Sequence, residues 1–199
     1  GALDGGEYIA VEGEGLTSDE LLMFLCILVV AGNETTRNAI SGGLMAFSKF
    51  PEQREKLLAN PDLWDSATEE IIRYVTPVLS FIRTSTEDHE LHGKQIKEGD
   101  KLLLLYQSAN RDDRVFDAPD EFRVDRSPNN HLAFGAGSHF CLGANLARLE
   151  VKLVFQELLS RLSDISAIEP HKLSRADHTL VLAIENMPTA FTPVIRQGV

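Results

Sequence analysis

The sequence has little cysteine, no run of basic residues and no apolar segment of membrane-spanning length. Only two of its 199 residues are cysteines, Cys26 and Cys141, which argues against a disulfide framework and favours a reducing compartment. The formal net charge is −11 and Lys and Arg do not cluster, which argues against nucleic acid as a partner, because phosphate backbones bind basic surfaces. The most apolar stretch, Leu21 to Ala31, is too short to cross a bilayer. A membrane partner is therefore not expected, and the stretch is interpreted as a buried helix that contains Cys26 as a buried hydrophobic residue.

Apolar residues are nevertheless plentiful, at 43% of the chain, and their spacing predicts mostly helices. Thr17 followed by Glu20 is a capping box, so a long helix is predicted to begin there and to continue to Phe50. Three residues are expected to interrupt it: Gly32, Thr35 and Thr36.

The pattern changes after the long helix. Two shorter helices are predicted over residues 51–60 and 63–75, and Pro77 ends the second because the residue before a proline avoids the helical conformation. Residues 81–110 alternate between apolar and polar types and are broken by glycines, which predicts short strands and a hairpin. Residues 111–130 are charged and aperiodic, so we expect a coil that side chains must hold.

A last helix is predicted from about Gly143, with an apolar stripe at positions 146, 149, 153 and 158 or their neighbours. Strands and turns are expected from residue 164 to residue 199. The expected fold class is therefore mainly α with small β sheets.

The stretch FGAGSHFCLG, residues 134–143, places Cys141 on a glycine-rich loop. A free cysteine is most often a small buried hydrophobic residue. Cys141 differs because a helix begins just after it, and the helix dipole and free backbone N–H groups at that end, expected to point at the sulfur, favour thiolate over thiol. Gly135, Gly137 and Gly143 carry no side chains, so a flat molecule has room to approach. A thiolate presented in this way is a metal ligand or a nucleophile.

The residues around Cys141 leave three interpretations. A nucleophile needs a general base, and His139 is the nearest candidate, although no third group is seen to place it. A zinc site needs several Cys or His ligands, and the sequence has no second cysteine-rich segment. Haem needs only a single thiolate from the protein, because the other ligand positions of its iron are already filled.

The same stretch resembles the haem-binding signature FxxGxxxCxG of the cytochrome P450 family, at Phe134, Gly137, Cys141 and Gly143. Two further motifs occur in the family's order: EIIR, residues 70–73, is similar to its ExxR pair, and AGNETT, residues 31–36, is similar to the acid and alcohol of its long helix. The resemblance implies the carboxyl-terminal half of the cytochrome P450 fold, with Cys141 as the iron ligand of haem b.

The resemblance also implies a buried network in which Arg126 joins Glu70 and Arg73 and ties the coil over the haem's proximal side. The plain alternative is an exposed ion pair between Glu70 and Arg73, which are spaced to meet on one helix face. Glu34 and Thr35 would relay protons to bound dioxygen, and Ala31 and Gly32 would leave room beside the helix. Alternatively, Thr35 bonds back to a carbonyl one turn earlier, and Glu34 is a surface charge.

Other roles follow from the resemblance alone. Arg83 and His139 would contact the haem propionates, and Phe134 and Gly135 would pack beside the sulfur. The implied reaction inserts one oxygen atom from O2 into a small apolar substrate, with electrons from a ferredoxin-type donor, in the cytoplasm. Two segments are expected to line the substrate pocket, 78–82 and 182–184. Arg148 and Lys152 are candidates for meeting an acidic redox partner, the alternative being that they are simply solvated.

Family catalytic domains are about twice as long as this chain, so the resemblance covers part of one domain. We expect residues 1–16 to be a loop remnant and residues 17–199 a partial haem-thiolate monooxygenase domain whose amino-terminal half is absent and would be a partner. Such a fragment would expose the apolar face of its long helix. A haem-binding or structural fragment without turnover of its own is the second interpretation, and an unrelated thiol enzyme or zinc protein is the third.

Overall fold

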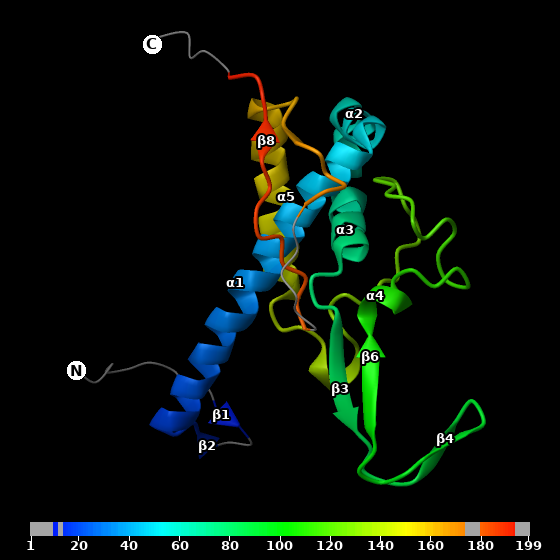
Figure 1. Cartoon of the computed structure of the whole chain (residues 1–199). Coiled ribbons are helices and arrows are strands. Elements are labelled where there is room, and N and C mark those ends of the chain that lie inside the picture. The colour runs from blue at the N-terminus through cyan, green and yellow to red at the C-terminus, as the bar shows by residue number, and fades with distance from the viewer. Residues whose placement is uncertain (1–9, 12–13, 174–179, 194–199) are drawn as a thin grey trace.

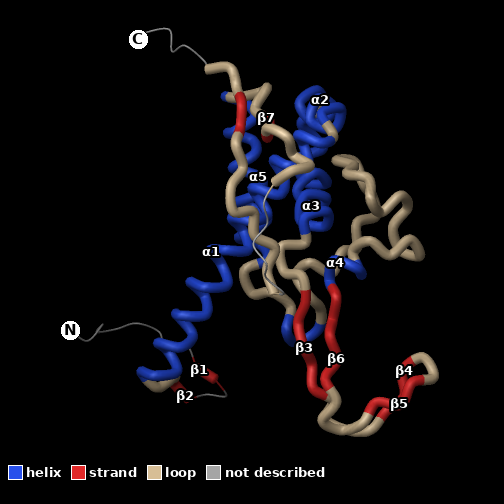
Figure 2. Tube along the Cα trace, in the orientation of Figure 1, coloured by secondary structure: helices blue, strands red, loops and turns tan. Residues whose placement is uncertain are grey.

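The computed structural model describes residues 10–11, 14–173 and 180–193, and it is mainly helical with small two-stranded sheets (Figures 1 and 2), which confirms the predicted fold class. The longer elements are α1 (Ser18–Lys49), α2 (Pro51–Ala59), α3 (Trp64–Val75) and α5 (Ala144–Arg161), with strands β3 (Ser80–Thr84) and β6 (Lys101–Leu105). The shorter ones are β1 (Ala10–Val11), β2 (Glu14–Gly15), η1 (Pro61–Leu63), β4 (His89–Leu91), β5 (Lys94–Ile96), α4 (Tyr106–Ala109), η2 (Gly137–His139), β7 (Ser166–Ala167) and β8 (Thr189–Ala190).

Helix α1 begins where the capping box predicts. The Thr17 hydroxyl accepts a hydrogen bond from the backbone N–H of Glu20, and the Glu20 carboxylate accepts from the backbone N–H of Thr17 at 2.8 Å. The expected interruption at Gly32, Thr35 and Thr36 is wrong, because the helix is continuous from residue 18 to residue 49. The Thr35 hydroxyl donates to the Ala31 carbonyl one turn earlier, a contact that a continuous helix accommodates.

The first half of α1 is exposed, so the interpretation of residues 21–31 as a buried helix is wrong for this chain. Leu22 is 59% exposed and Val30 is 70% exposed, and Cys26, expected to be buried, is exposed as well. The buried residues of α1 lie between Asn38 and Phe47, in the part of the helix against which α3 and α5 pack (Figure 1). The apolar residues predicted that the first half of α1 is buried, but no described element packs over it.

Two adjacent glycines let α1 approach its neighbours closely. A Cβ added at Gly42 would lie 2.6 Å from a methyl of Val75 on α3, and one added at Gly43 would lie 2.7 Å from the ring of Phe155 on α5. Such distances are well below van der Waals contact, so only glycine permits this spacing. The core formed there includes Phe47, whose ring meets those of Phe122 and Phe155 edge-on.

Helix α5 buries mostly other residues than those predicted for its apolar stripe, although Leu158 packs against the core and Leu159 beside it is buried. Residues 146, 149 and 153 are about half exposed, whereas Ala144, Val151, Phe155 and Leu159 are buried. Both sets recur at helical spacing and both are apolar, so periodicity alone could not choose between them. Packing against α1 and α3 selected the second set.

The predicted strands and hairpin form within residues 80–105, whereas residues 106–109, also expected in this strand region, form the short helix α4. β3 and β6 pair antiparallel from Ser80 opposite Leu105 to Thr84 opposite Lys101, and β4 and β5 form the hairpin. The hairpin turns at His92 and Gly93, both with positive φ, which is the backbone that a tight antiparallel turn requires. Helix α3 ends at Val75, and Thr76 before Pro77 leaves the right-handed helical conformation at φ 46°.

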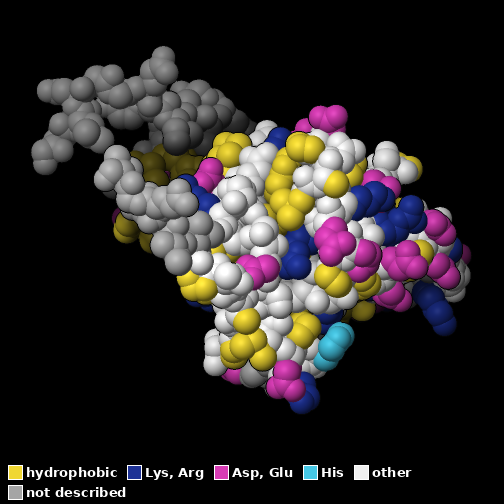
Figure 3. All heavy atoms as spheres, turned by 90° about the horizontal axis from the view of Figure 1, so that it is seen from above, with side chains coloured by type: hydrophobic (Ala, Val, Ile, Leu, Met, Phe, Trp, Pro, Cys, Tyr) yellow, Lys and Arg dark blue, Asp and Glu magenta, His cyan; other side chains and the backbone are white. Residues whose placement is uncertain are grey.

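The remainder of the chain is coil and short strands. Residues 111–130 form no regular helix or strand, as predicted, and β7 and β8 pair antiparallel in the carboxyl-terminal segment. Within the described ranges, no helix is long and apolar enough to cross a membrane. Figure 3 shows acidic and basic side chains interspersed with apolar ones on the face it presents.

Candidate functional site

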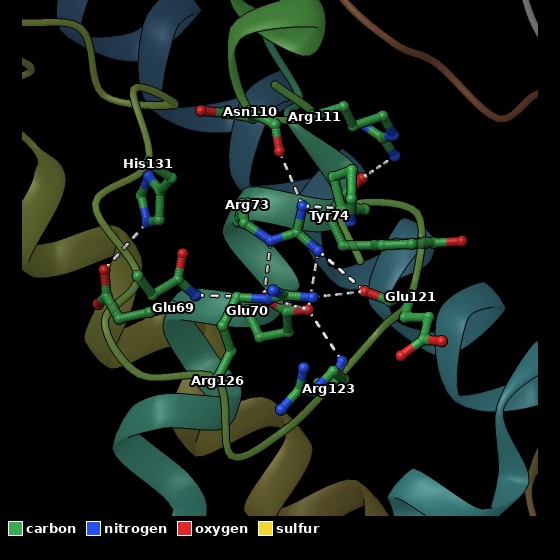
Figure 4. Close-up of polar contacts among 12 residues, drawn as sticks. Glu69, Glu70, Arg73, Tyr74, Asn110, Arg111, Glu121, Arg123, Arg126 and His131 are labelled. Carbon is green, nitrogen blue, oxygen red and sulfur yellow. Dashed lines mark hydrogen bonds and ion pairs between the residues drawn. The ribbon is translucent and has the colours of Figure 1, made fainter. Parts of the chain in front are cut away.

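A buried ion network lies at the carboxyl-terminal end of α3 (Figure 4). The Glu70 carboxylate accepts hydrogen bonds from Arg73 Nε at 2.7 Å and from Arg126 Nε at 3.0 Å, and Glu70 and Arg73 have no exposed side-chain surface. The backbone N–H of Arg123 and the side-chain amide of Asn129 donate to the same carboxylate. The spacing of Glu70 and Arg73 therefore produces a buried pair rather than an exposed one.

The two arginines fasten the irregular coil. Arg73 uses all five of its N–H groups, two of them on Glu70 and the others on the carbonyl oxygens of residues 110, 119 and 121. Arg126 donates to the carbonyl oxygens of residues 117, 118 and 121. Helix α3 thus holds a segment that has no secondary structure of its own, whereas the position of this segment over the proximal side of a haem stays a prediction.

Asn110 continues the network toward the cysteine loop. Its side-chain amide donates to the buried hydroxyl of Thr76 at 2.9 Å, and its side-chain carbonyl accepts from the backbone N–H of Leu132 at 2.7 Å. Its backbone carbonyl accepts from Arg73 at 2.8 Å. Asn110 was not identified from the sequence, because a single Asn between the predicted strands and the predicted coil belongs to no motif.

The loop around Cys141 is closed by its own backbone. The N–H of Cys141 donates to the carbonyl of Phe134 at 2.9 Å, and Gly135 and Gly137 turn the chain with φ of 72° and 69°, a conformation that favours glycine. Gly143 is the N-cap of α5, two residues after Cys141. The loop thus holds a half-buried Cys141 thiol at the start of a helix.

The expected direction of the free N–H groups toward the sulfur stays a prediction. Among the described residues, no hydrogen bond to Sγ of Cys141 forms. The N–H of Ala144 donates to the carbonyl of Cys141 at 3.2 Å, and that of Ala147 donates to the carbonyl of Gly143 at 2.9 Å. The first turn of α5 therefore satisfies part of its own backbone.

The surroundings of Cys141 fit a flat, largely apolar group with one thiolate ligand. A Cβ built on Gly137 or on Gly143 would meet nothing within 4 Å, so the space over both glycines is open. The neighbouring side chains of Phe140 and Leu142 are 52% and 77% exposed. Apolar surface of this kind is what the body of a haem would cover. In the described residues, no three His, Cys, Asp or Glu side chains are grouped to hold a metal ion, so a multi-ligand zinc site has no support there.

The predicted acid and alcohol make their contacts within α1. Glu34 pairs with Arg37 at 2.6 Å, with 46% of its side chain exposed, and the Thr35 hydroxyl donates to the Ala31 carbonyl at 2.6 Å. Ala31 and Gly32 are exposed on the same part of α1, and nothing lies within 4 Å of a Cβ built on Gly32. Within the described ranges, no hydrogen bond or ion pair joins these residues to the loop that carries Cys141.

The residues predicted near the edge of the site are partly accessible. Arg83 lies on β3, half-buried, with its guanidinium 5.9 Å from the ring of Phe81, and His139 is exposed in η2.

The two segments predicted to line a substrate pocket lie side by side. The Leu182 N–H donates to the Pro77 carbonyl at 2.8 Å, and the Leu79 N–H donates to the Leu180 carbonyl at 2.8 Å.

Arg148 and Lys152, considered as surface cations, are paired with acids of α3. Lys152 lies 2.6 Å from Asp65, and Arg148 lies 2.6 Å from Glu69. These four residues help line a groove of about 480 Å³ between α3 and α5.

His131 Nε2 also lies within hydrogen-bond distance of the Glu69 carboxylate, at 3.0 Å (Figure 4). Neither Glu69 nor His131 was identified from the sequence. The only available signal was their position, because Glu69 precedes the EIIR motif and His131 precedes FGAGSHFCLG by three residues.

Residues 7–186 match the family model described as Cytochrome P450. The chain is 40% identical over 183 residues to a steroid C26-monooxygenase of Mycolicibacterium smegmatis, covering 92% of this chain and 46% of that protein. It is 50% identical over 161 residues to a methyl-branched lipid omega-hydroxylase of Mycobacterium tuberculosis, covering 80% of this chain and 38% of that protein. The chain therefore spans less than half the length of these curated relatives.

Solved structures agree with this comparison. The Bacillus subtilis cytochrome P450 PksS, of the bacillaene polyketide synthase, superposes with a TM-score of 0.87 at 38% identity, covering 92% of this chain and 47% of that one. A Mycobacterium marinum cytochrome P450 in complex with pseudoionone superposes with a TM-score of 0.85 at 43% identity, covering 91% and 44%.

Proposed function

The chain belongs to the cytochrome P450 family, and we propose that the protein is a haem-thiolate monooxygenase with Cys141 as the iron ligand. The observation that carries the proposal is the loop itself: a half-buried thiol, held by the bond from its N–H to the Phe134 carbonyl, stands between open glycines and exposed apolar side chains. When bound, haem b supplies the iron that activates dioxygen with electrons from a redox partner.

The protein's own contribution begins with the position of Sγ. The closed loop fixes the backbone that carries the Cys141 side chain, and we propose that the half-buried Phe134 shields one side of the sulfur from water. The Glu70, Arg73 and Arg126 network holds the coil that leads into this loop, so we assign these three residues a structural role.

Proton delivery is assigned to Glu34 and Thr35. The Thr35 hydroxyl donates its proton to the Ala31 carbonyl and keeps its oxygen lone pairs free to accept, while Glu34 is partly exposed and can exchange protons with solvent. Gly32 and Ala31 leave space for water beside these two groups. The side chains of Arg83 and His139 carry the donors proposed to bind the haem propionates. Gly135, with φ of 72°, lets the cysteine loop turn.

A small apolar substrate is proposed because the segment 78–82, which lies beside residues 180–182, carries the exposed apolar side chains of Phe81 and Ile82. The names of the relatives, which mention steroids and a methyl-branched lipid, support this class. A ferredoxin-type electron donor and a cytoplasmic location stay predictions from the resemblance.

The ligand assignment is tested by the spectrum of the reduced carbon monoxide complex. We expect the strongly red-shifted band of thiolate-ligated haem from the protein and from Cys26→Ser, the matched control at the other cysteine. Cys141→Ser is expected to lose this band. A spectrum unchanged by Cys141→Ser would contradict the assignment of the ligand.

A second candidate is a haem-binding or structural chain that does not turn over by itself. The exposed apolar first half of α1, where Val29 is 69% exposed and Val30 is 70% exposed, favours it, because patches of this kind normally lie against another segment or partner. A thiolate-haem band with no substrate-dependent consumption of electrons would support this candidate. Residues 17–199 would then be only part of a monooxygenase domain, as proposed from the resemblance, and a separate amino-terminal half would be its partner.

The proton role is tested with Thr35→Ala. We expect the haem spectrum to be retained and the amount of product per electron consumed to fall, because the hydroxyl that handles protons is gone. Thr192→Ala removes a hydroxyl that bonds to Asp164 on the surface and serves as the control. An unchanged yield per electron in Thr35→Ala would remove Thr35 from the mechanism.

A further inference from the structure

Glu69 holds two segments that flank Cys141 on both sides in the sequence. Its carboxylate accepts from His131 Nε2 at 3.0 Å, and from Arg148 through Nε at 2.6 Å and a terminal guanidinium nitrogen at 3.1 Å. His131 precedes Cys141 by ten residues and Arg148 follows it by seven. One carboxylate on α3 therefore joins the two ends of the cysteine loop.

Each partner of Glu69 makes a second contact inside the loop. His131 Nδ1 accepts from the backbone N–H of Ala133 at 3.2 Å, so the proton donated to Glu69 lies on Nε2. The Arg148 guanidinium lies 4.6 Å from the centre of the Phe134 ring. The Phe134 carbonyl in turn accepts from the Cys141 N–H. Through His131 and through Arg148, Glu69 is thus connected to Ala133 and Phe134, and the Phe134 carbonyl binds the N–H of Cys141.

Burial distinguishes this cluster from an ordinary surface ion pair. The His131 side chain is 2% exposed, and Glu69 and Arg148 are 29% and 32% exposed. Burial alone would raise the pKa of Glu69, but the hydrogen bonds from His131 and Arg148 outweigh it and lower the pKa to about 2. In the same groove, Asp65 pairs with Lys152 and is 87% exposed, as expected for a weak contact.

We propose that Glu69 is a positioning residue for Cys141: by binding His131 and Arg148 together, it fixes the loop and thereby the direction and accessibility of the thiol. Glu70, its neighbour on α3, faces the coil at residues 117–126 and is assigned to the fold as a whole. The two adjacent carboxylates of the EEIIR segment therefore have different tasks. The significance of this for haem ligation rests on the proposed function, but the positioning itself does not require haem.

The test measures how fast each cysteine of the 199-residue chain is alkylated by iodoacetamide, with peptide mass spectrometry to separate the two sites. Cys26 is exposed on α1 and serves as the internal reference. We expect Glu69→Ala to raise the rate of Cys141 relative to Cys26 by about fivefold or more, because loss of charge-assisted hydrogen bonds makes local opening more frequent. Glu69→Gln keeps one acceptor oxygen and is expected to give a smaller increase.

The control is Glu157→Ala, which removes an exposed partner of Arg161 on α5 and is expected to leave the ratio unchanged. A ratio unchanged in Glu69→Ala would overturn the proposal, whether or not both alkylation rates rise. Should Glu69→Ala fail to fold, Glu69→Gln decides, since an unchanged ratio in that variant refutes the proposal. If the haem assignment is wrong but the positioning role is right, the protein will lack the thiolate-haem band, and Glu69→Ala will still raise the alkylation rate of Cys141 relative to Cys26.

Discussion

Replacement of Arg73 by Lys is the sharpest test of the buried network, because it keeps the charge and removes the guanidinium fork. Arg73 saturates five acceptor contacts with no exposed side-chain surface, whereas a lysine ammonium has three N–H donors at one point. At least two buried carbonyl or carboxylate contacts must then be lost. Each buried group left without its charged partner costs about 1–3 kcal/mol, so we expect a loss of about 3–5 kcal/mol in the free energy of unfolding.

The assay is urea unfolding of the chain followed by circular dichroism, with Arg161→Lys as the control. Arg161 pairs with Glu157 on the surface and is 73% exposed, so its replacement is expected to change the free energy of unfolding by less than about 0.5 kcal/mol. A loss comparable to that of the control would refute the reasoning that the fork geometry holds the coil. Domains are commonly stable by only about 5–15 kcal/mol, so an insoluble Arg73→Lys protein is consistent with the expected size.

Three further outcomes are expected. Gly43→Ala should lower the free energy of unfolding by about 1–3 kcal/mol, because its Cβ would lie 2.7 Å from the Phe155 ring; a midpoint in urea equal to that of the unchanged protein would contradict this packing. Glu69 has its pKa lowered from 4.5 to about 2, so its contribution to stability is complete above pH 4.5 and is lost as the pH falls toward 2. The urea midpoints of the protein and of Glu69→Gln should therefore converge between pH 5 and pH 2.5, and a constant difference would count against the ion pair. Val30→Glu, at a side chain that is 70% exposed, should change stability by less than about 0.5 kcal/mol, and a loss of several kcal/mol would show that this part of α1 is covered in solution.

The motifs of the candidate site are local, which is why the sequence revealed them. The glycine positions of the cysteine loop are backbone requirements, and Gly135 and Gly137 do adopt the left-handed conformation. The spacing of Glu70 and Arg73 is a property of one helix, so the meeting of these two side chains was predictable. Glu69, His131 and Asn110 were missed because their partners are 22 to 79 residues away in the chain.

The sequence by itself determined the helices, the hairpin, the coil and the cysteine loop, because capping residues, glycines, prolines and hydrophobic periodicity act over a few residues. It did not decide which apolar face each helix buries. Helix α5 carries two such stripes, and packing against α1 and α3 selects the one that is buried, with Phe155 placed against Gly43. The exposure of residues 21–30 was likewise decided by tertiary structure, because burial depends on which segments are present to cover a surface rather than on the surface itself.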